Sequence, residues 1–358
     1  MQPRTNTVLR TALVGCGYIG ASAYLPQIEL CPRLELIAAC DSVGDRAAAV
    51  ARGRSGVSVF SSFRKMLAAG LELDLIVNAT PVPDHEQVSR AGIEAGLHVY
   101  SEKPLAITYV GACELISAAR ARGVRLVAAP DSTTKPWFDV LNRLVESGEL
   151  GTIHSAYGRI SDNMSSDGQF RSAWYVGPSG GVLRDLGSYQ LTELTALFGP
   201  AASVTATLRT VVPLRTIAAG RVVRVESEDL AVVTLAMKNG VVATIDACSS
   251  DGAWEDPRLE IRGTEGTVQI RHSSSDTFEI VSRAGGTRIV SVPTASNSWC
   301  SGVREFAEDI VTGSGLAMTA EHAAHVVEII EGSISASRTS RSTELRSNFD
   351  EVALRPRG

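Results

Sequence analysis

The first third of the chain alternates short apolar runs with amphipathic stretches, and this alternation limits the fold more than any other feature. Runs that are apolar on both faces suit strands of a parallel sheet covered by helices. The candidate strands are residues 11–14, 34–40, 57–60, 73–79, 98–101 and 125–128. The helical patterns between them are residues 20–30, 45–52, 61–69, 84–95 and 108–122. Right-handed crossovers then predict an α/β fold with a doubly wound parallel sheet over residues 1–129.

The pattern changes after residue 130, where strands cluster together. Helices are predicted at 136–147, 185–198, 301–311 and 320–336, and strands at 153–160, 230–237, 241–247, 258–261 and 267–270. Clustered strands predict a mostly antiparallel sheet packed by helices, forming a second domain over residues 130–338. Asn239-Gly240 predicts a type I′ hairpin turn. The polar tail, residues 339–358, is expected to be disordered.

A glycine loop follows the first predicted strand and opens the first helix. It reads Gly15-Cys16-Gly17-Tyr18-Ile19-Gly20, the pattern that lets backbone approach a pyrophosphate at a helix N-terminus. Asp41 ends the second predicted strand, where a carboxylate accepts both ribose hydroxyls of NAD. Ser42 follows instead of an arginine, so the sequence favours NAD, while Arg46 nearby leaves NADP possible. The alternative for Asp41 is a helix N-cap.

Polar residues also follow the fourth and fifth predicted strands. Residues expected to line the nicotinamide side of a dinucleotide cleft are Ala79, Thr80, Pro81, His85, Glu102 and Lys103. His85 is a structural or cofactor-contacting residue in this interpretation, and Glu102 holds the ammonium of Lys103. A cationic acid/base group beside a dinucleotide cleft is typical of a dehydrogenase, although a lysine here could equally be a surface charge.

A second constellation is Gly180-Gly181-Val182-Leu183-Arg184-Asp185-Leu186-Gly187-Ser188-Tyr189. Asp185 and Tyr189 are four residues apart at the start of a predicted helix and therefore share a face. If that helix packs over the cleft, both side chains reach toward Lys103. The alternative is an aspartate N-cap and a core tyrosine.

Together, the stretches VGCGYIG, NATPVPDH, HVYSEKPLA, GGVLRDLGSY and LEIRGTEGTVQI resemble the Gfo/Idh/MocA family of sugar and cyclitol oxidoreductases. The resemblance implies a Rossmann domain followed by an α/β domain with a large, mostly antiparallel open sheet. That sheet commonly serves as an oligomer surface in the family, which implies a homodimer or homotetramer. Many members carry histidine where this chain has Tyr189, whereas glucose–fructose oxidoreductase and some nucleotide-sugar ketoreductases have tyrosine.

The resemblance implies reversible hydride transfer between a nicotinamide cofactor and a secondary alcohol or ketone of a sugar, cyclitol or nucleotide-sugar. Lys103 and Tyr189 are the candidate acid/base groups, either of which could be the principal one, and Asp185 orients Lys103 or a substrate hydroxyl. Two alternatives are an NAD-dependent glycosidase that uses transient oxidation and a non-catalytic NAD-binding sugar sensor. Retention of both Lys103 and Tyr189 argues against the sensor.

Further substrate contacts are expected from the second domain and its junction. Besides Lys103, Asp185 and Tyr189, the candidates are Asp131, Arg159, Asp162, Asn163, Trp174 and Tyr175. Arg171 and Arg184 could bind a phosphate, which would favour a nucleotide-sugar. His322 and His325 lack the further ligands of a metal site, so no metal is predicted and both are interpreted as surface or interface residues.

Composition excludes several other classes of function. The chain has 34 basic and 39 acidic residues, a formal net charge of −5, so it has no general attraction for nucleic acid or anionic membranes. No apolar run approaches the roughly 18 residues of a membrane span. Residues 1–10 lack the apolar core of a signal peptide, and the six cysteines are scattered. The sequence therefore favours a cytoplasmic protein with reduced thiols.

Overall fold

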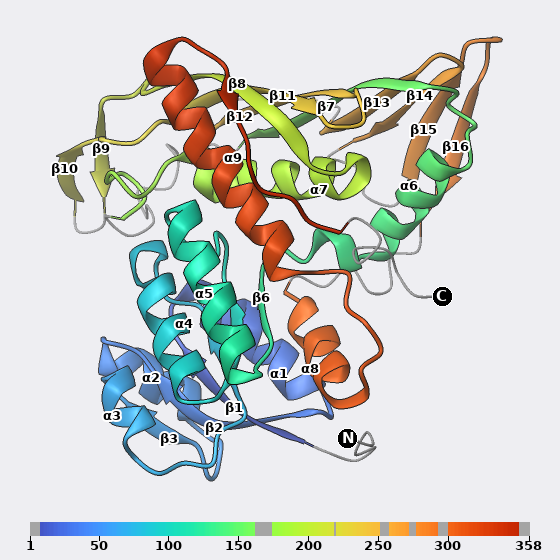
Figure 1. The fold of residues 1–358 in the computed structure, drawn as a ribbon. Helices are drawn as coiled ribbons and strands as arrows, with labels where there is room; N and C mark the ends of the chain where they lie inside the picture. The colour runs from blue at the N-terminus through green and yellow to red at the C-terminus, as the bar shows by residue number, and fades with distance from the viewer. Residues whose placement is uncertain are drawn as a thin grey trace. The chain divides into compact units, whose positions relative to one another are not determined.

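The computed structural model describes residues 8–161, 174–217, 220–250, 258–271, 277–292 and 300–350. These residues form two compact units, each with its own hydrophobic core (Figure 1). The first unit contains residues 8–134 and 300–324, and the second contains the described residues of 135–297 together with 325–350. Among all described residues, no helix is long and apolar enough to cross a membrane.

The first unit is built on a six-stranded parallel sheet in the order β3-β2-β1-β4-β5-β6. Its strands are β1 (Leu9–Val14), β2 (Leu34–Cys40), β3 (Ser58–Phe60), β4 (Leu75–Asn78), β5 (His98–Ser101) and β6 (Leu126–Ala128). The helices are η1 (Gly20–Tyr24, a π turn), α1 (Leu25–Leu30), α2 (Gly44–Ala51), α3 (Phe63–Leu67), α4 (His85–Glu94) and α5 (Tyr109–Arg122), with 3₁₀ turns η2 (Val82–Asp84) and η3 (Ser132–Thr134). This confirms the doubly wound parallel sheet.

A later helix, α8 (Gly302–Thr312), also belongs to the first unit. Phe306 packs against Tyr100 with ring centroids 5.9 Å apart, and the Arg33 guanidinium lies 2.9 Å from the Glu308 carboxylate. Asp309 is buried and pairs with Arg125. The expected boundary near residue 130 followed chain order alone, whereas these contacts bring α8 back to the first unit.

The second unit contains a nine-stranded sheet in the order β16-β15-β14-β13-β7-β12-β11-β8-β17. Strands β7 and β12 pair in parallel, and the other described pairs of this sheet are antiparallel. The bounds are β7 (Ile153–Ser161), β8 (Ala201–Arg209), β11 (Leu230–Met237), β12 (Val242–Cys248), β13 (Leu259–Gly263), β14 (Gly266–Ile270), β15 (Thr277–Ser282), β16 (Thr287–Ser291) and β17 (Thr343–Glu344). A separate hairpin joins β9 (Leu214–Ile217) to β10 (Arg221–Arg224). The mostly antiparallel sheet is thus confirmed.

Helices cover one face of this sheet. They are α6 (Pro136–Glu146), the π turn η4 (Leu183–Gly187) with α7 (Ser188–Phe198), and the part of α9 (Ala320–Thr339) that belongs to the second unit. Leu141, Leu194 and Ile329 from these helices share one core with the inward residues of the strands. On the opposite face, alternate strand residues such as Val232 and Val242 remain 40% and 46% exposed. The sheet is therefore open on one side.

The hairpin between β11 and β12 differs from the predicted type I′ turn. Gly240 has φ of 90°, but Asn239 is not among the residues with positive φ, and a type I′ turn requires both. The Gly240 amide donates to the Met237 carbonyl at 3.0 Å, and the Met237 amide donates to Val241 at 2.9 Å. The loop therefore has three residues, and the type I′ prediction is wrong.

The tail and the two late histidines also differ from expectation. Strand β17 pairs with β8, and Leu345 and Phe349 are buried, so the described residues 340–350 are ordered and the prediction of disorder is wrong for them. Residues 351–358 lie outside the described residues. His322 and His325 are buried instead of lying on the surface, because α9 packs them inward. Among the described residues, no cluster of three side chains could hold a metal ion.

His325 joins the tail to the second unit. Its Nε2 accepts a hydrogen bond from the Ala201 amide at 3.0 Å, so Nδ1 carries the proton and lies 2.6 Å from Ser347 Oγ. The Glu328 carboxylate accepts from the Ser347 amide at 2.8 Å. Burial lowers the pKa of His325 from 6.5 to about 4. This anchor therefore depends on a neutral imidazole.

Candidate active site

Three of the predicted site segments lie at the carboxyl ends of neighbouring strands in the first unit. Strands β1, β4 and β5 are neighbours in the sheet, so their carboxyl ends lie side by side. The glycine loop follows β1, residues 79–81 follow β4, and residues 102–104 follow β5. The strand order reverses between β1 and β4, and ligands of open α/β sheets bind at such a reversal. A cofactor site is therefore expected at these strand ends.

Glycine is required at different positions of the loop for different structural reasons. Gly15 has φ of 90°, and a Cβ there would lie 2.4 Å from the carbonyl carbon of Ala79. A Cβ on Gly20 would lie 2.0 Å from the Gly15 carbonyl oxygen. At Gly17, in contrast, a Cβ would meet no atom within 4 Å. Gly17 therefore leaves open space beside backbone, which fits the close approach of a dinucleotide pyrophosphate.

Asp41 connects the glycine loop to the end of β2. Its two carboxylate oxygens accept hydrogen bonds from the amides of Cys16 and Val43, both at 2.8 Å, and Arg46 lies 3.9 Å away. Each oxygen retains lone pairs for a ribose hydroxyl. Burial, with Asp41 nearby, raises the pKa of Cys16 to about 12, so this thiol stays neutral. In the same loop, Tyr18 is exposed and Ile19 is half-buried.

Asn78 and His85 shape the loop after β4. Asn78 donates to the His85 carbonyl and to Ser89 Oγ, both at 3.0 Å, and its Oδ1 accepts from Thr80 Oγ1 at 2.6 Å. The ring of His85 is buried, with Nε2 2.8 Å from the Thr80 carbonyl and Nδ1 2.9 Å from the Pro104 carbonyl. Burial lowers the pKa of His85. His85 thus links the loops after β4 and β5 through protein carbonyls.

Glu102 makes its described hydrogen bonds to a tyrosine and to backbone. Its Oε1 accepts from the hydroxyl of Tyr24 at 2.6 Å, and its Oε2 accepts from the amide of Lys103 at 3.1 Å. These contacts give the carboxylate a role in shaping the loop, beyond the expected one of holding the Lys103 ammonium. Sequence reasoning missed Tyr24, because 78 residues separate it from Glu102. Tyr24 lies in the π turn η1, and Pro26, which lacks an amide, is one mark of an irregular helix there.

The Asp185 segment of the second unit begins in another π turn, η4. Gly181 has φ of 104°, and a Cβ there would lie 2.2 Å from the Glu228 carboxylate. The Glu228 carbonyl accepts from the Val182 amide at 3.0 Å, and its carboxylate accepts from the Leu183 amide at 3.2 Å. Glu228, from the chain before β11, therefore supplies the acceptors at the start of this helix.

Arg184 is buried and interacts electrostatically with that carboxylate. Its guanidinium donates to the Gly180 carbonyl at 3.4 Å, and burial lowers its pKa while the nearby Glu228 opposes this. The suggestion that Arg184 binds a substrate phosphate stays a prediction, and the structure shows only that this side chain is buried, like that of Asp185. Arg171, Asp162 and Asn163 lie outside the described residues.

Asp185 is buried and Tyr189 is half-buried on the same helical segment. The Asp185 amide donates to the Gly181 carbonyl at 3.1 Å, and its carbonyl accepts from Ser188 Oγ at 3.2 Å. Trp174 and Tyr175 pack edge to face, 5.9 Å apart, and their backbone carbonyls would obstruct a Cβ on Gly180. The structure thus places Trp174 near the start of the Asp185 segment.

The other two described candidates for substrate contact, Asp131 and Arg159, belong to different units. The Asp131 carboxylate accepts from the Gly302 amide at 2.7 Å and so holds the start of α8, which gives it a structural role in the first unit. Arg159 lies on the exposed side of β7. Its neighbour Gly158 faces Gln190 of α7, and adjacent strand residues point to opposite faces. The sheet therefore separates Arg159 from the Asp185 segment.

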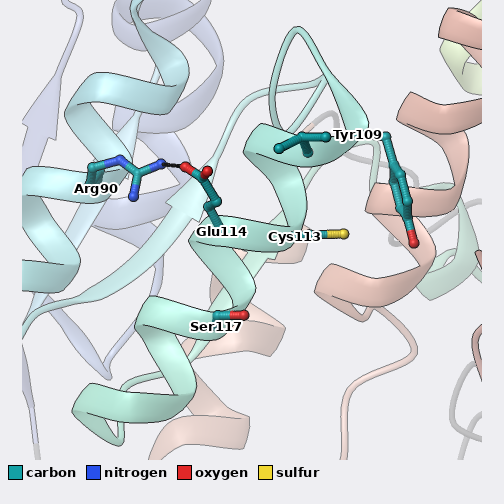
Figure 2. A pocket seen from close by; sticks show the side chains of 6 residues that line it. Arg90, Tyr109, Cys113, Glu114 and Ser117 are labelled. Carbon is teal, nitrogen blue, oxygen red and sulfur yellow. Dashed lines mark hydrogen bonds and ion pairs between the residues drawn. The ribbon is translucent and has the colours of Figure 1, made fainter.

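A surface groove of about 420 Å³ lies on the outer side of α4 and α5 (Figure 2). It is lined by Arg90, Tyr109, Val110, Cys113, Glu114 and Ser117. The guanidinium of Arg90 lies 2.8 Å from the Glu114 carboxylate and 3.3 Å from that of Glu86. The charged groups of the groove thus neutralise one another, and none of its residues belongs to the predicted site.

Comparison with known proteins shows which family models and which relatives this chain matches. Residues 9–129 match the model of an oxidoreductase family with an NAD-binding Rossmann fold, and residues 138–269 match the Gfo/Idh/MocA C-terminal domain. The chain is 26% identical over 305 residues to the D-apiose dehydrogenase of Paraburkholderia graminis, covering 83% of this chain and 76% of that one. It is 25% identical over 301 residues to the NADP⁺-dependent scyllo-inositol 2-dehydrogenase of Bacillus subtilis, covering 76% and 79%.

A solved structure also has the same fold. The levoglucosan dehydrogenase complex with NADH and levoglucosan is 21% identical, with a TM-score of 0.83, and the match covers 94% of this chain and 99% of the other. The two family models lie on the two sheets described above and together span both candidate constellations. The chain therefore belongs to the Gfo/Idh/MocA family of oxidoreductases, with an NAD-binding Rossmann fold in its first unit.

Proposed function

We propose that this oxidoreductase transfers a hydride between NAD and a secondary alcohol or ketone of a sugar or cyclitol. The observation that carries the proposal is the edge formed by β1, β4 and β5, where Lys103 follows the strand beside an open glycine loop. The names of the D-apiose, levoglucosan and scyllo-inositol dehydrogenases support a polyhydroxylated substrate.

Residues of the first unit would hold the cofactor. The backbone from Gly15 to Gly20 would receive the pyrophosphate, Asp41 the ribose hydroxyls, and residues 79–81 would line the nicotinamide side. When bound, NAD supplies the hydride acceptor, and its reduced form supplies the donor. Arg46, close to Asp41, keeps NADP as a second possibility for a binding assay to decide.

Residues of both units would serve the substrate. Lys103 and Tyr189 would hydrogen-bond the reacting oxygen, and one of them would take or give its proton. Asp185 would orient Lys103 or a neighbouring hydroxyl, and Trp174 would lie against the sugar. Lys103 belongs to the first unit and the other three to the second, so their meeting at one substrate is part of the proposal. Residues 130–338 would supply the substrate surface.

A paired assay tests this function. Calorimetry would measure binding of NAD and NADP, and nicotinamide absorbance would follow turnover on a panel of sugars, cyclitols and nucleotide-ketosugars. We expect Lys103→Ala and Tyr189→Phe each to lower kcat at least about a hundredfold, since general acid/base catalysis contributes that much. Lys65→Ala, at an exposed lysine of α3, is the matched control and should leave turnover unchanged.

Two outcomes would favour the alternatives. Release of free sugar from a glycoside without net cofactor reduction would support an NAD-dependent glycosidase. Tight NAD binding with no turnover on any compound would support a sugar sensor. Full activity of Lys103→Ala would contradict the proposed role of that lysine.

We also propose a cytoplasmic homodimer or homotetramer that associates through the open face of the nine-stranded sheet. Val232 and Val242, 40% and 46% exposed, give that face apolar area that association would cover. Val232→Asp should shift the sedimentation coefficient toward the monomer. An unchanged coefficient would place the interface elsewhere.

A further inference from the structure

Tyr24 joins the helix after the glycine loop to the segment that carries Lys103. It is the last residue of the π turn η1, in which the Leu25 amide donates to the Gly20 carbonyl five residues earlier. Its side chain is fully buried, and its hydroxyl lies 2.6 Å from Glu102 Oε1, although 78 residues separate them in the chain. A hydrogen bond to an ionised acceptor is roughly twice as strong as one between neutral groups.

The Glu102 carboxylate, held by Tyr24, in turn restrains the backbone of Lys103. Glu102 Oε2 accepts from the Lys103 amide at 3.1 Å, and the Glu102 amide donates to the Asn78 carbonyl at 2.8 Å. On the other side of Lys103, the Pro104 carbonyl meets the His85 ring at 2.9 Å. The backbone that presents Lys103 is thus held before and after that residue.

Comparison with a neighbouring tyrosine indicates that burial alone does not explain the hydrogen bond from Tyr24 to Glu102. Tyr100 is equally buried and lies edge to face with Tyr24, with ring centroids 5.7 Å apart. Its hydroxyl has no hydrogen-bond partner among the described residues. The same layer therefore tolerates one tyrosine without the bond that the other makes. Burial, followed by the nearby Glu102, raises the pKa of Tyr24 well above 10, which keeps its hydroxyl a donor.

We propose that Tyr24 is a positioning residue, whose hydroxyl fixes Glu102 and thereby sets the backbone at Lys103 relative to the helix that follows the glycine loop. The inference rests on the proposed function, since Lys103 receives its catalytic role there. Tyr24 itself touches neither substrate nor cofactor in this proposal. Its hydroxyl affects kcat by fixing the backbone position of Lys103.

The first test compares Tyr24→Phe with Tyr100→Phe in the full-length protein. Each variant removes one buried hydroxyl from the same layer. We expect Tyr24→Phe to lower kcat about tenfold, which corresponds to about 1.4 kcal/mol of barrier, with less than about a twofold change in KM or in the calorimetric Kd for NAD. Tyr100→Phe should leave all three within about twofold. Equal kcat values for the two variants would overturn the proposal.

A second test asks whether Tyr24 acts through Glu102. In a Glu102→Ala background, Tyr24→Phe should cause no further loss of kcat, because coupled residues are not additive. Hydrogen exchange, which needs no turnover, should be faster at the Lys103 amide in Tyr24→Phe than in Tyr100→Phe. Additive losses of kcat with unchanged exchange would overturn the proposal. If Glu102→Ala does not fold, Glu102→Leu, which also has no acceptor oxygen, provides the same comparison.

Different results would refute the proposed function and the inference about Tyr24. If Lys103→Ala retains full turnover, the proposed function fails at that residue. If Lys103→Ala is inactive while Tyr24→Phe has normal kcat and normal amide exchange, Lys103 keeps its role and only the inference about Tyr24 fails.

Discussion

The Lys103 loop and the Asp185 helix are held in place by different kinds of contact. Each lies next to a π turn, η1 in the first unit and η4 in the second. The Lys103 loop is held through the side chain of Glu102, which accepts from the Tyr24 hydroxyl, and through the His85 ring beside the Pro104 carbonyl. The Asp185 helix depends on the buried carboxylate of Glu228 beside the buried guanidinium of Arg184.

The two regions contain different titratable groups. The Tyr24 hydroxyl stays a donor at ordinary pH, because its pKa is raised. Burial raises the pKa of Glu228, so the folded chain binds this proton more readily than the unfolded chain. The contribution of Glu228 to the free energy of unfolding therefore falls as pH rises from its unfolded pKa through its raised folded pKa. Glu228 is therefore the group through which pH is expected to act on the Asp185 helix.

The largest expected effect is in the first region. At Gly15, a positive φ and backbone atoms 2.4 Å from a Cβ leave no room for a side chain. Gly15→Ala should lower the free energy of unfolding by about 4 kcal/mol, the sum of backbone strain and overpacking. Urea denaturation followed by circular dichroism would measure it.

Gly17→Ala is the control for that measurement, since a Cβ there meets no atom. It should change the free energy of unfolding by less than about 0.5 kcal/mol and raise the Kd for NAD at least about tenfold, because the methyl group enters the space beside the loop. Equal destabilisation by the two variants would contradict the assignment of different roles to these glycines.

Acid should weaken the second unit through His325. Its pKa falls from 6.5 in the unfolded chain to about 4 in the folded one, so its stabilising contribution is complete above pH 6.5 and is lost as pH falls toward about 4. The loss is about 3 kcal/mol. Urea unfolding at pH 7 and pH 4 should show a smaller drop in His325→Gln than in the wild type. A drop of the same size in both would exclude His325 as the acid-sensitive group.

A smaller effect is expected where Gly181 meets Glu228. Gly181→Ala should lower the free energy of unfolding by about 2 kcal/mol, because the residue has positive φ but the obstructing atoms belong to a flexible side chain. Adding Glu228→Ala should restore part of this loss, since the carboxylate is then gone. A full double-mutant cycle measures the coupling, and additive losses would show that the two residues do not restrain the Asp185 helix together.

Much of the fold followed from local pattern. The runs at 34–40, 98–101 and 230–237 coincide with β2, β5 and β11, because a strand buried on one or both faces needs a periodic apolar sequence. Strands β8, β9, β10, β15, β16 and β17 were missed. Strands β10 and β16 have no buried residue, so their sequences carry little apolar periodicity. Strands β9 and β15 bury alternate residues, but each run is short.

The sequence alone determined the order of the strands and helices in residues 8–129, the three loops that follow neighbouring strands there and the candidate pair Lys103 and Tyr189. Those features depend on local periodicity, on turn residues and on motifs a few residues long. The tertiary structure decided that α8 returns to the first unit, that Tyr24 bonds Glu102 and that Glu228 begins the Asp185 helix. Each of these contacts joins residues 45 or more positions apart. Only the folded backbone brings such groups within hydrogen-bond distance, and no local pattern in the chain encodes that distance.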